Sequence, residues 1–232
     1  LYKLLLTLIA FVYLNSCSIN PVSGNQDFVL FSEERELEIG RSYNAQILQN
    51  EKVYADKKLQ NYVQAVGESL ADISHRSNLV YRFTILDSQN VNAFALPGGY
   101  IFIYRGLLSH LSSEEELAAV LGHELGHVTA RHSIRQASKA QVLDILSYAV
   151  GSKMGSTASN VATLASGAFL AGYGREMELQ ADSLGAEYMA EVGYSTKGML
   201  ETISVLKEQE MYSKEVADRR GSGPQTYHGV FS

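Results

Sequence analysis

The sequence has little cysteine, tryptophan or proline. Its 232 residues include one cysteine, no tryptophan and three prolines. A single cysteine cannot form an internal disulfide, which excludes a small scaffold held together by disulfide bonds. Collagen-like repeats and wholesale disorder are excluded because 46% of the residues are hydrophobic and 19% are charged. The chain is therefore predicted to be globular and long enough to bury a sizeable core.

Positive charge is also scarce. The chain has 19 lysine and arginine residues against 25 aspartate and glutamate residues, a formal net charge of -6. A nucleic-acid-binding protein usually needs a basic surface that displaces counterions from phosphates. The acidic balance therefore argues against a nucleic-acid partner.

The amino-terminal residues have the pattern of a secretory signal that ends at the single cysteine. Lys3 precedes an uncharged apolar run over residues 4–14, about half the roughly 20 residues that a membrane-spanning helix needs. The run ends in Leu-Asn-Ser-Cys17, which resembles a bacterial lipobox. We expect residues 1–16 to be a lipoprotein signal peptide and Cys17 to carry the lipid. The alternative is a buried core cysteine that follows a short apolar helix.

The residues after the cysteine suit a secreted, lipid-anchored chain. Residues 18–26 are polar and turn-forming, so residues 17–31 are predicted to be a tether. No cysteine follows Cys17, which is consistent with an oxidising compartment. With Ser18 next to the lipidated cysteine, we expect a bacterial cell-envelope protein on the periplasmic face of the outer membrane.

The remaining residues, 32–232, are predicted to form one α+β domain that is mostly helical. Apolar residues recur at helical spacing over residues 32–48 and 59–73. Residues 79–87 are rich in β-forming residues and are predicted to be a strand. A short extended piece that begins at Asn92, a Pro-Gly-Gly turn and a strand over residues 100–104 predict a hairpin in a small sheet. From Ser113 onward the pattern is almost entirely helical.

The strongest chemical motif is His123-Glu124-Leu-Gly-His127, an HExxH sequence. Two histidines four residues apart on a helix share one face, so both imidazoles can reach one metal ion. The glutamate lies beside that face and can reach a metal-bound water without ligating the metal. The alternative is a solvated helix whose histidines bind nothing.

Two glycines within this helix indicate close packing. Gly122 and Gly126 are four residues apart and each costs about 1 kcal/mol of helix propensity relative to alanine. We expect the backbone of another segment to pass close to this stripe. The helix is therefore predicted to be buried rather than exposed.

A hydrolytic zinc site needs a third protein ligand, and residues 175–182 offer one. Glu178 and Asp182 are four residues apart and share a helix face. If Glu178 ligates the metal, Asp182 can accept a hydrogen bond from a ligand imidazole. Arg175 can pair with either carboxylate. By spacing alone, an ordinary charged helix face is an equal alternative.

Three segments resemble one known family. HELGHVTARH, GREMELQAD and VNAFALPGGYIFIYRGLL are similar to the zinc metallopeptidases that include the HtpX heat-shock protease and the CaaX prenyl protease. The chain looks most like their periplasmic lipoprotein branch, typified by BepA and LoiP, from about Val29 to Gly229. The resemblance implies a zincin-like domain with one Zn²⁺ held by His123, His127 and Glu178. It also implies that Glu124 is the catalytic base and that Asp182 is the aspartate of the ExxxD motif.

The function expected from this resemblance is zinc-dependent endopeptidase activity on misfolded or unassembled envelope proteins. The extended piece Asn92-Ala93-Phe94-Ala95 is predicted to bind the substrate as an edge strand. The alternative is that it only packs the hairpin against the helix. Two other functions stay open: a chaperone-like or scaffold lipoprotein whose zinc site is mostly closed, and a zinc-dependent hydrolase that acts on bonds other than peptides.

The histidines outside the motif receive separate interpretations. His132 follows His127 by five residues, so it is predicted to point away from the ligand pair, at the end of the helix. Family members commonly continue into a Thr-His-Pro motif, whereas this sequence stops at Ser232, as in a truncated domain. His228 is a candidate to replace that histidine, although a terminal residue without this role is the alternative, and Tyr227 and His228 are weak candidates to donate to the oxyanion.

Overall fold

The computed structural model describes residues 17–149, 173–204, 206, 208 and 211. The expected signal peptide, Tyr227 and His228 lie outside the described residues. The described chain is mostly helical and has a small three-stranded sheet, so the predicted α+β class is confirmed. Within the described part of the chain, no helix is both long enough and apolar enough to cross a membrane.

The segment that was predicted to be a tether forms a hairpin. Strands β1 (Cys17–Ile19) and β2 (Gln26–Phe28) pair antiparallel. The hairpin is attached to helix α6 (His132–Ala149), because the Asp27 carboxylate lies 2.9 Å from the Arg135 guanidinium and the Leu30 N–H donates to Ser138 Oγ. Residues 17–31 are therefore folded against the domain, while lipidation of Cys17 stays a prediction.

The first two long helices begin at side-chain caps. The Ser32 side chain accepts from the Arg35 N–H at the start of α2 (Glu33–Asn50). The Asp56 carboxylate accepts from two backbone N–H groups at the start of α3 (Lys57–Ala71). Such caps satisfy donors that have no partner within the helix. Both helices agree with the apolar periodicity of the sequence.

The sheet contains the predicted hairpin and one parallel neighbour. Its strands are β3 (Arg82–Leu86), β4 (Ala93–Leu96) and β5 (Tyr100–Tyr104), in the order β3-β5-β4. β4 and β5 pair antiparallel around the turn that contains Gly98 and Gly99, whose φ angles of 78° and 93° favour glycine. β3 pairs parallel with β5. β4 is therefore an edge strand.

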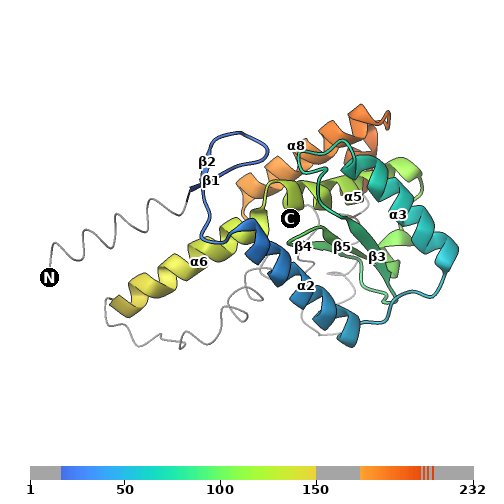
Figure 1. Cartoon of the computed structure of the whole chain (residues 1–232). Coiled ribbons are helices and arrows are strands. Elements are labelled where there is room, and N and C mark those ends of the chain that lie inside the picture. The colour runs from blue at the N-terminus through green and yellow to red at the C-terminus, as the bar shows by residue number, and fades with distance from the viewer. Residues whose placement is uncertain (1–16, 150–172, 205, 207, 209–210, 212–232) are drawn as a thin grey trace, which may run out of the picture.

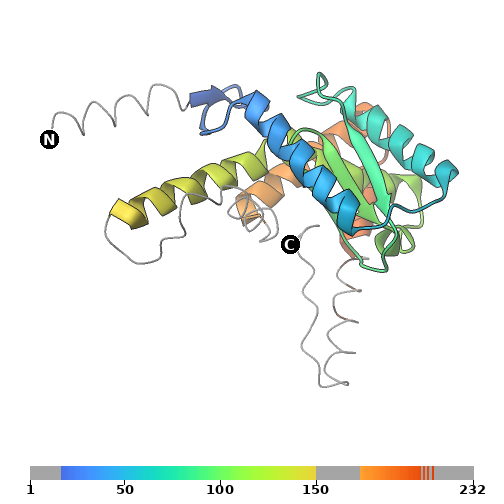
Figure 2. The same ribbon diagram turned by 60° about the horizontal axis from the view of Figure 1, so that its bottom comes forward.

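The two faces of the sheet are covered by different helices. Ile101 and Ile103 of β5 join the main core with α3 and α5 (Glu114–Thr129), whereas Tyr100, Phe102 and Tyr104 pack with side chains of α2. This alternation is expected because successive strand residues point to opposite faces. α2 crosses the sheet in Figure 2, on the face away from α5. Both faces are buried.

Helices α5 and α8 (Arg175–Glu191) form the closest helix pair in the domain (Figure 1). A Cβ atom added at Gly126 would lie 2.8 Å from the carbonyl oxygen of Ala181 on α8, and one at Gly122 would lie 3.2 Å from Gly185. The predicted close approach of another backbone is therefore confirmed. It brings residues near position 178 against the HExxH motif.

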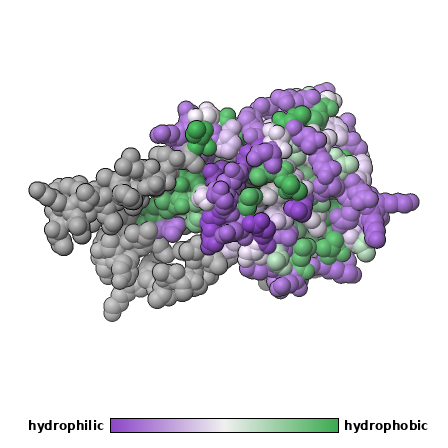
Figure 3. Space-filling model, viewed as in Figure 1, coloured by the Kyte–Doolittle hydropathy of each residue, from purple (hydrophilic) through white to green (hydrophobic). Residues whose placement is uncertain are grey.

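The described surface is mainly polar. Hydrophilic residues cover most of the face in Figure 3. Large exposed apolar side chains lie on separate elements, for example Ile19 on β1 and Leu200 in the helical residues 197–204. Exposed apolar residues of this kind are common. Buried polar residues are the stronger indication of function in this molecule.

Candidate metal centre

The HExxH motif lies inside the protein. α5 is enclosed by the sheet, α3 and α8, and His123, Glu124 and His127 are at most 1% exposed. Ionisable side chains are rarely buried without partners, because losing hydration is costly. The burial of three such groups on one helix therefore indicates that they share a partner.

Glu178 of α8 meets the two histidines. The Nε2 atoms of His123 and His127 are 3.0 Å apart, and the Glu178 carboxylate lies 3.4 Å from the first and 3.9 Å from the second. One ligand atom from each of the three residues lies within 4.8 Å of the others. Two imidazoles and one carboxylate therefore converge from two helices that are far apart in sequence.

The donor atoms fit a metal ion. Neither carboxylate oxygen of Glu178 has a hydrogen-bond partner within the described structure, although the side chain is buried. Buried polar atoms without a protein partner are rare in folded proteins, and those that occur often bind an ion or an ordered water. Two imidazoles and a carboxylate form a known ligand set of catalytic zinc sites. The site can hold a divalent cation.

Asp182 orients the first histidine. Its carboxylate lies 2.8 Å from Nδ1 of His123, one helical turn beyond Glu178. Burial would lower the pKa of His123, but the carboxylates of Asp182 and Glu178 outweigh it and raise the pKa to about 9. With Nδ1 donating to Asp182, Nε2 faces the other two ligands. This is the arrangement that the i, i+4 spacing of the two carboxylates predicts.

His132 orients the second histidine, contrary to the sequence prediction. Its Nδ1 lies 2.9 Å from Nδ1 of His127, and the residue is fully buried. α5 ends at Thr129, and Arg131 has a φ of 55°, so the helix is interrupted and the chain turns before α6 starts. Helical spacing therefore does not apply across this turn. Burial lowers the pKa of His132 to about 4 and also lowers that of His127.

A tyrosine that the sequence analysis missed completes the surroundings of His127. The Tyr173 ring stacks on the His127 ring with centroids 4.0 Å apart and planes at 20°. Its hydroxyl lies 2.8 Å from Ser133 Oγ. Tyr173 immediately precedes the N-cap of α8, and no spacing pattern in the sequence indicates it. The tyrosine restricts the orientation of the imidazole.

Glu124 lies beside the three candidate ligands. One of its carboxylate oxygens has no hydrogen-bond partner in the described part of the chain. Burial raises the pKa of Glu124 to about 8, opposed by His123 and by the backbone N–H of Ala95. The carboxylate therefore faces both the candidate ligands and the edge strand β4.

The remaining predicted residues differ in their positions. Arg175 is exposed, and the ion pairs of Glu178 and Asp182 in the described structure are with His123 and His127, so pairing with Arg175 stays a prediction. It is the first residue of α8, which contacts α5 at Glu178, Ala181 and Gly185, and it lines a shallow surface pocket with Arg135 and Gln180. Asn92 and residues 93–95 lie on or next to the edge strand, beside α5, as expected.

Comparison with known proteins agrees with this geometry. The model of peptidase family M48 matches residues 57–228. The chain is 26% identical over 215 residues to the beta-barrel assembly-enhancing protease of Escherichia coli K12, which covers 88% of this chain and 44% of that protein. It is 30% identical over 148 residues to the mitochondrial metalloendopeptidase OMA1 of Arabidopsis thaliana, covering 63% of this chain and 30% of that protein.

Another relative has a more similar length. The metalloprotease YcaL of Escherichia coli K12 is 27% identical over 154 residues, which cover 65% of this chain and 58% of that protein. The chain spans less than half the length of the assembly-enhancing proteases that it matches. The family model covers most of the chain, including both helices that carry the candidate ligands. The chain therefore belongs to peptidase family M48.

Proposed function

We propose that the protein is a zinc-dependent endopeptidase whose metal is held by His123, His127 and Glu178. The observation that carries this proposal is the buried Glu178 carboxylate, which has no hydrogen-bond partner among the described residues and faces two imidazole nitrogens. A cation would satisfy these oxygens. Zinc is the metal most often bound by this combination of ligands at a hydrolytic site.

The chain's own residues supply proton transfer and positioning. A bound zinc ion would act as a Lewis acid on the scissile carbonyl and lower the pKa of water to about 7. Glu124 would take a proton from that water and return it to the leaving amine. Asp182 and His132 hold the two ligand rings by their Nδ1 atoms. Helices α5 and α8 keep these groups at fixed separation through their glycine contact.

The edge strand β4 is proposed to bind the substrate. Asn92 O accepts from the Tyr104 N–H, and antiparallel ladders alternate, so the N–H and C=O groups of Ala93 and Ala95 face the open edge. The Ala93 N–H donates to Asn92 Oδ1, and that of Ala95 faces Glu124. A peptide strand paired here would pass directly beside the proposed base.

Replacing Ala95 with proline tests this pairing. Proline removes the outward N–H of residue 95 and leaves the hydrogen bonds between β4 and β5 intact, because Ala95 does not donate to β5. We expect KM for an unfolded protein substrate to rise about threefold to tenfold, the effect of one lost hydrogen bond. Ala95→Ser is the control, since it keeps the N–H. An unchanged KM in the proline variant would show that the substrate does not pair there.

The cellular setting is also a proposal. The lipobox-like sequence before Cys17 supports a lipid anchor, and assembly-enhancing proteases are among the relatives. We infer that the protein lies at the periplasmic face of the bacterial outer membrane. Its substrates would be misfolded or unassembled envelope proteins, bound as extended chains.

Metal analysis combined with cleavage assays tests the proposed function. Purified protein is expected to contain one zinc ion per chain and to cleave an unfolded protein such as casein. A chelator should abolish cleavage, and added zinc should restore it. Zinc binding without any cleavage would favour the scaffold function instead. Hydrolysis of an ester while peptides stay intact would favour a hydrolase of another specificity.

A further inference from the structure

The contact between His127 and His132 leaves one proton to be assigned. Their Nδ1 atoms are 2.9 Å apart and both rings are buried, so a single hydrogen lies between them. If His127 donates it, the other nitrogen of His127 carries a free lone pair. If His132 donates it, a neutral His127 carries its proton on Nε2 and cannot bind a metal through that atom. The hydrogen-bond partners of His132 decide between these cases.

The other nitrogen of His132 faces a side-chain amide of α8. His132 Nε2 lies 3.0 Å from Gln180 Oε1, and Arg135 Nη1 lies 3.3 Å from the same atom. An arginine can only donate, so the amide atom that it contacts must be the carbonyl oxygen. This removes the usual ambiguity between oxygen and nitrogen in a glutamine side chain. His132 must therefore carry a hydrogen on Nε2.

A hydrogen on Nε2 makes His132 the acceptor at its other nitrogen. If His132 also had a hydrogen on Nδ1, it would be a buried imidazolium beside the Arg135 cation, with no carboxylate in hydrogen-bond contact among the described residues. Burying such a charge is costly. The neutral ring accepts at Nδ1, so His127 donates from Nδ1 and its Nε2 lone pair faces Glu178 and His123.

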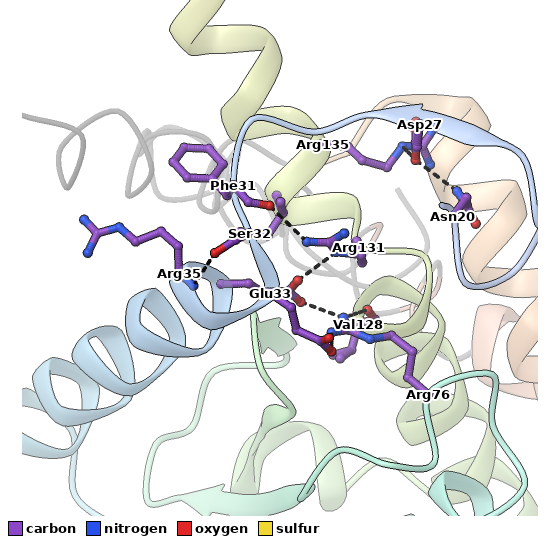
Figure 4. Close-up of polar contacts among 12 residues, drawn as sticks. Asn20, Asp27, Phe31, Ser32, Glu33, Arg35, Arg76, Val128, Arg131 and Arg135 are labelled. Atoms are coloured by element: carbon purple, nitrogen blue, oxygen red, sulfur yellow. Dashed lines mark hydrogen bonds and ion pairs between the residues drawn. The ribbon is translucent and has the colours of Figure 1, made fainter. Parts of the chain in front are cut away.

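The outer end of this chain of contacts reaches the amino-terminal hairpin. The Arg135 Nε donates to Asp27 Oδ2 at 2.9 Å, and Asn20 donates to the same carboxylate oxygen at 3.0 Å (Figure 4). Asp27 therefore holds the guanidinium that fixes the Gln180 amide. The contacts run from β2 through α6 and α8 to the candidate ligand on α5.

From these contacts we infer that Gln180 and His132 are positioning residues that hold His127 in its metal-binding tautomer. His123 donates from Nδ1 to the Asp182 carboxylate in the same way. His127 differs because its Nδ1 donates to the neutral imidazole of His132. The inference rests on the proposed metal site, because it assigns His127 as a ligand. It adds two residues whose effect on the metal is exerted through His127 alone.

Nuclear magnetic resonance of ring nitrogens in metal-free wild-type protein tests the tautomers directly. With ¹⁵N-labelled histidine, His132 is expected to carry its hydrogen on Nε2 and His127 on Nδ1. Finding the hydrogen of His132 on Nδ1 would overturn the inference. The measurement does not depend on zinc, so it decides the inference even if wild-type protein fails to bind zinc and the proposed function fails.

Variants at Gln180, which is only half-buried, test the consequence for the metal. Gln180→Met removes the acceptor, so His132 should populate both tautomers and the Kd for zinc should rise about tenfold. Gln180→Glu keeps an acceptor for both donors and should restore a Kd close to that of wild type. Gln46→Met, on exposed α2 residue Gln46, is the matched control. A Gln180→Met protein that binds zinc as tightly as the control would overturn the inference, as would equal losses in both Gln180 variants.

Discussion

Replacing Glu124 with glutamine is expected to lower the rate of peptide cleavage by about 10²–10⁴ while the protein keeps its zinc. The range is the usual contribution of a general base. Glutamine has nearly the same shape as glutamate, but its amide cannot accept the proton from water. The ligand atoms of His123, His127 and Glu178 are unchanged by the substitution. The measurement is cleavage of an unfolded protein at saturating substrate, with zinc content determined on the same sample.

Glu187→Gln is the matched control for this experiment. Glu187 is an exposed residue of α8, so its loss changes the net charge by the same amount and leaves the site intact. We expect wild-type activity from it. Cleavage at the wild-type rate by zinc-loaded Glu124→Gln would show that another group takes the proton. Loss of zinc together with activity would instead assign Glu124 to metal binding.

The main elements of the site follow from local patterns in the sequence. The helical pattern from Ser113 onward and the HExxH spacing predict α5, and Glu178 and Asp182 four residues apart predict that they share a face of α8. The glycine pair in α5 predicts that another backbone packs there. Each of these is a local pattern within one helix. Spacing alone leaves Glu178 and Asp182 equally compatible with an ordinary charged face, so their assignment to the metal comes from the resemblance to the family.

The parts that could not be predicted depend on how the chain turns between helices. His132 reaches His127 only because Arg131 adopts a left-handed backbone conformation, which the sequence does not indicate for an arginine. Gln180 contacts His132, and Tyr173 stacks on His127. No motif or spacing in the sequence marks either residue. The folding of residues 17–31 against α6 depends on an ion pair between residues more than a hundred positions apart.

The left-handed turn after α5 is held by a buried carboxylate of α2. Glu36 is 1% exposed and binds two arginines, with Arg76 at 2.6 Å and Arg131 at 2.7 Å. Figure 4 shows this cluster, in which Arg76 also contacts Glu33 and the carbonyl of Val128 near the end of α5. Burial opposes the charge of Arg76, but Glu36 outweighs it and raises the pKa of the guanidinium. Arg76 therefore stays charged inside the protein.

Replacing Glu36 with alanine is expected to lower the free energy of unfolding by about 3–5 kcal/mol, because it leaves buried cations without their partner. Such a loss is a large fraction of the stability of an ordinary domain. Urea unfolding followed by circular dichroism measures it. Glu38→Ala on the same helix is the control, since its ion pair with Arg35 is more than half exposed and should contribute less than about 1 kcal/mol.

The comparison separates burial from charge, because each variant removes one glutamate and one ion pair from α2. If Glu36→Ala unfolds at the same urea concentration as Glu38→Ala, the cluster does not stabilise the protein. If it unfolds much earlier, the turn that carries His132 depends on a contact with the first long helix. The geometry at the metal ligands would then rest on residues nearly a hundred positions before them in the sequence.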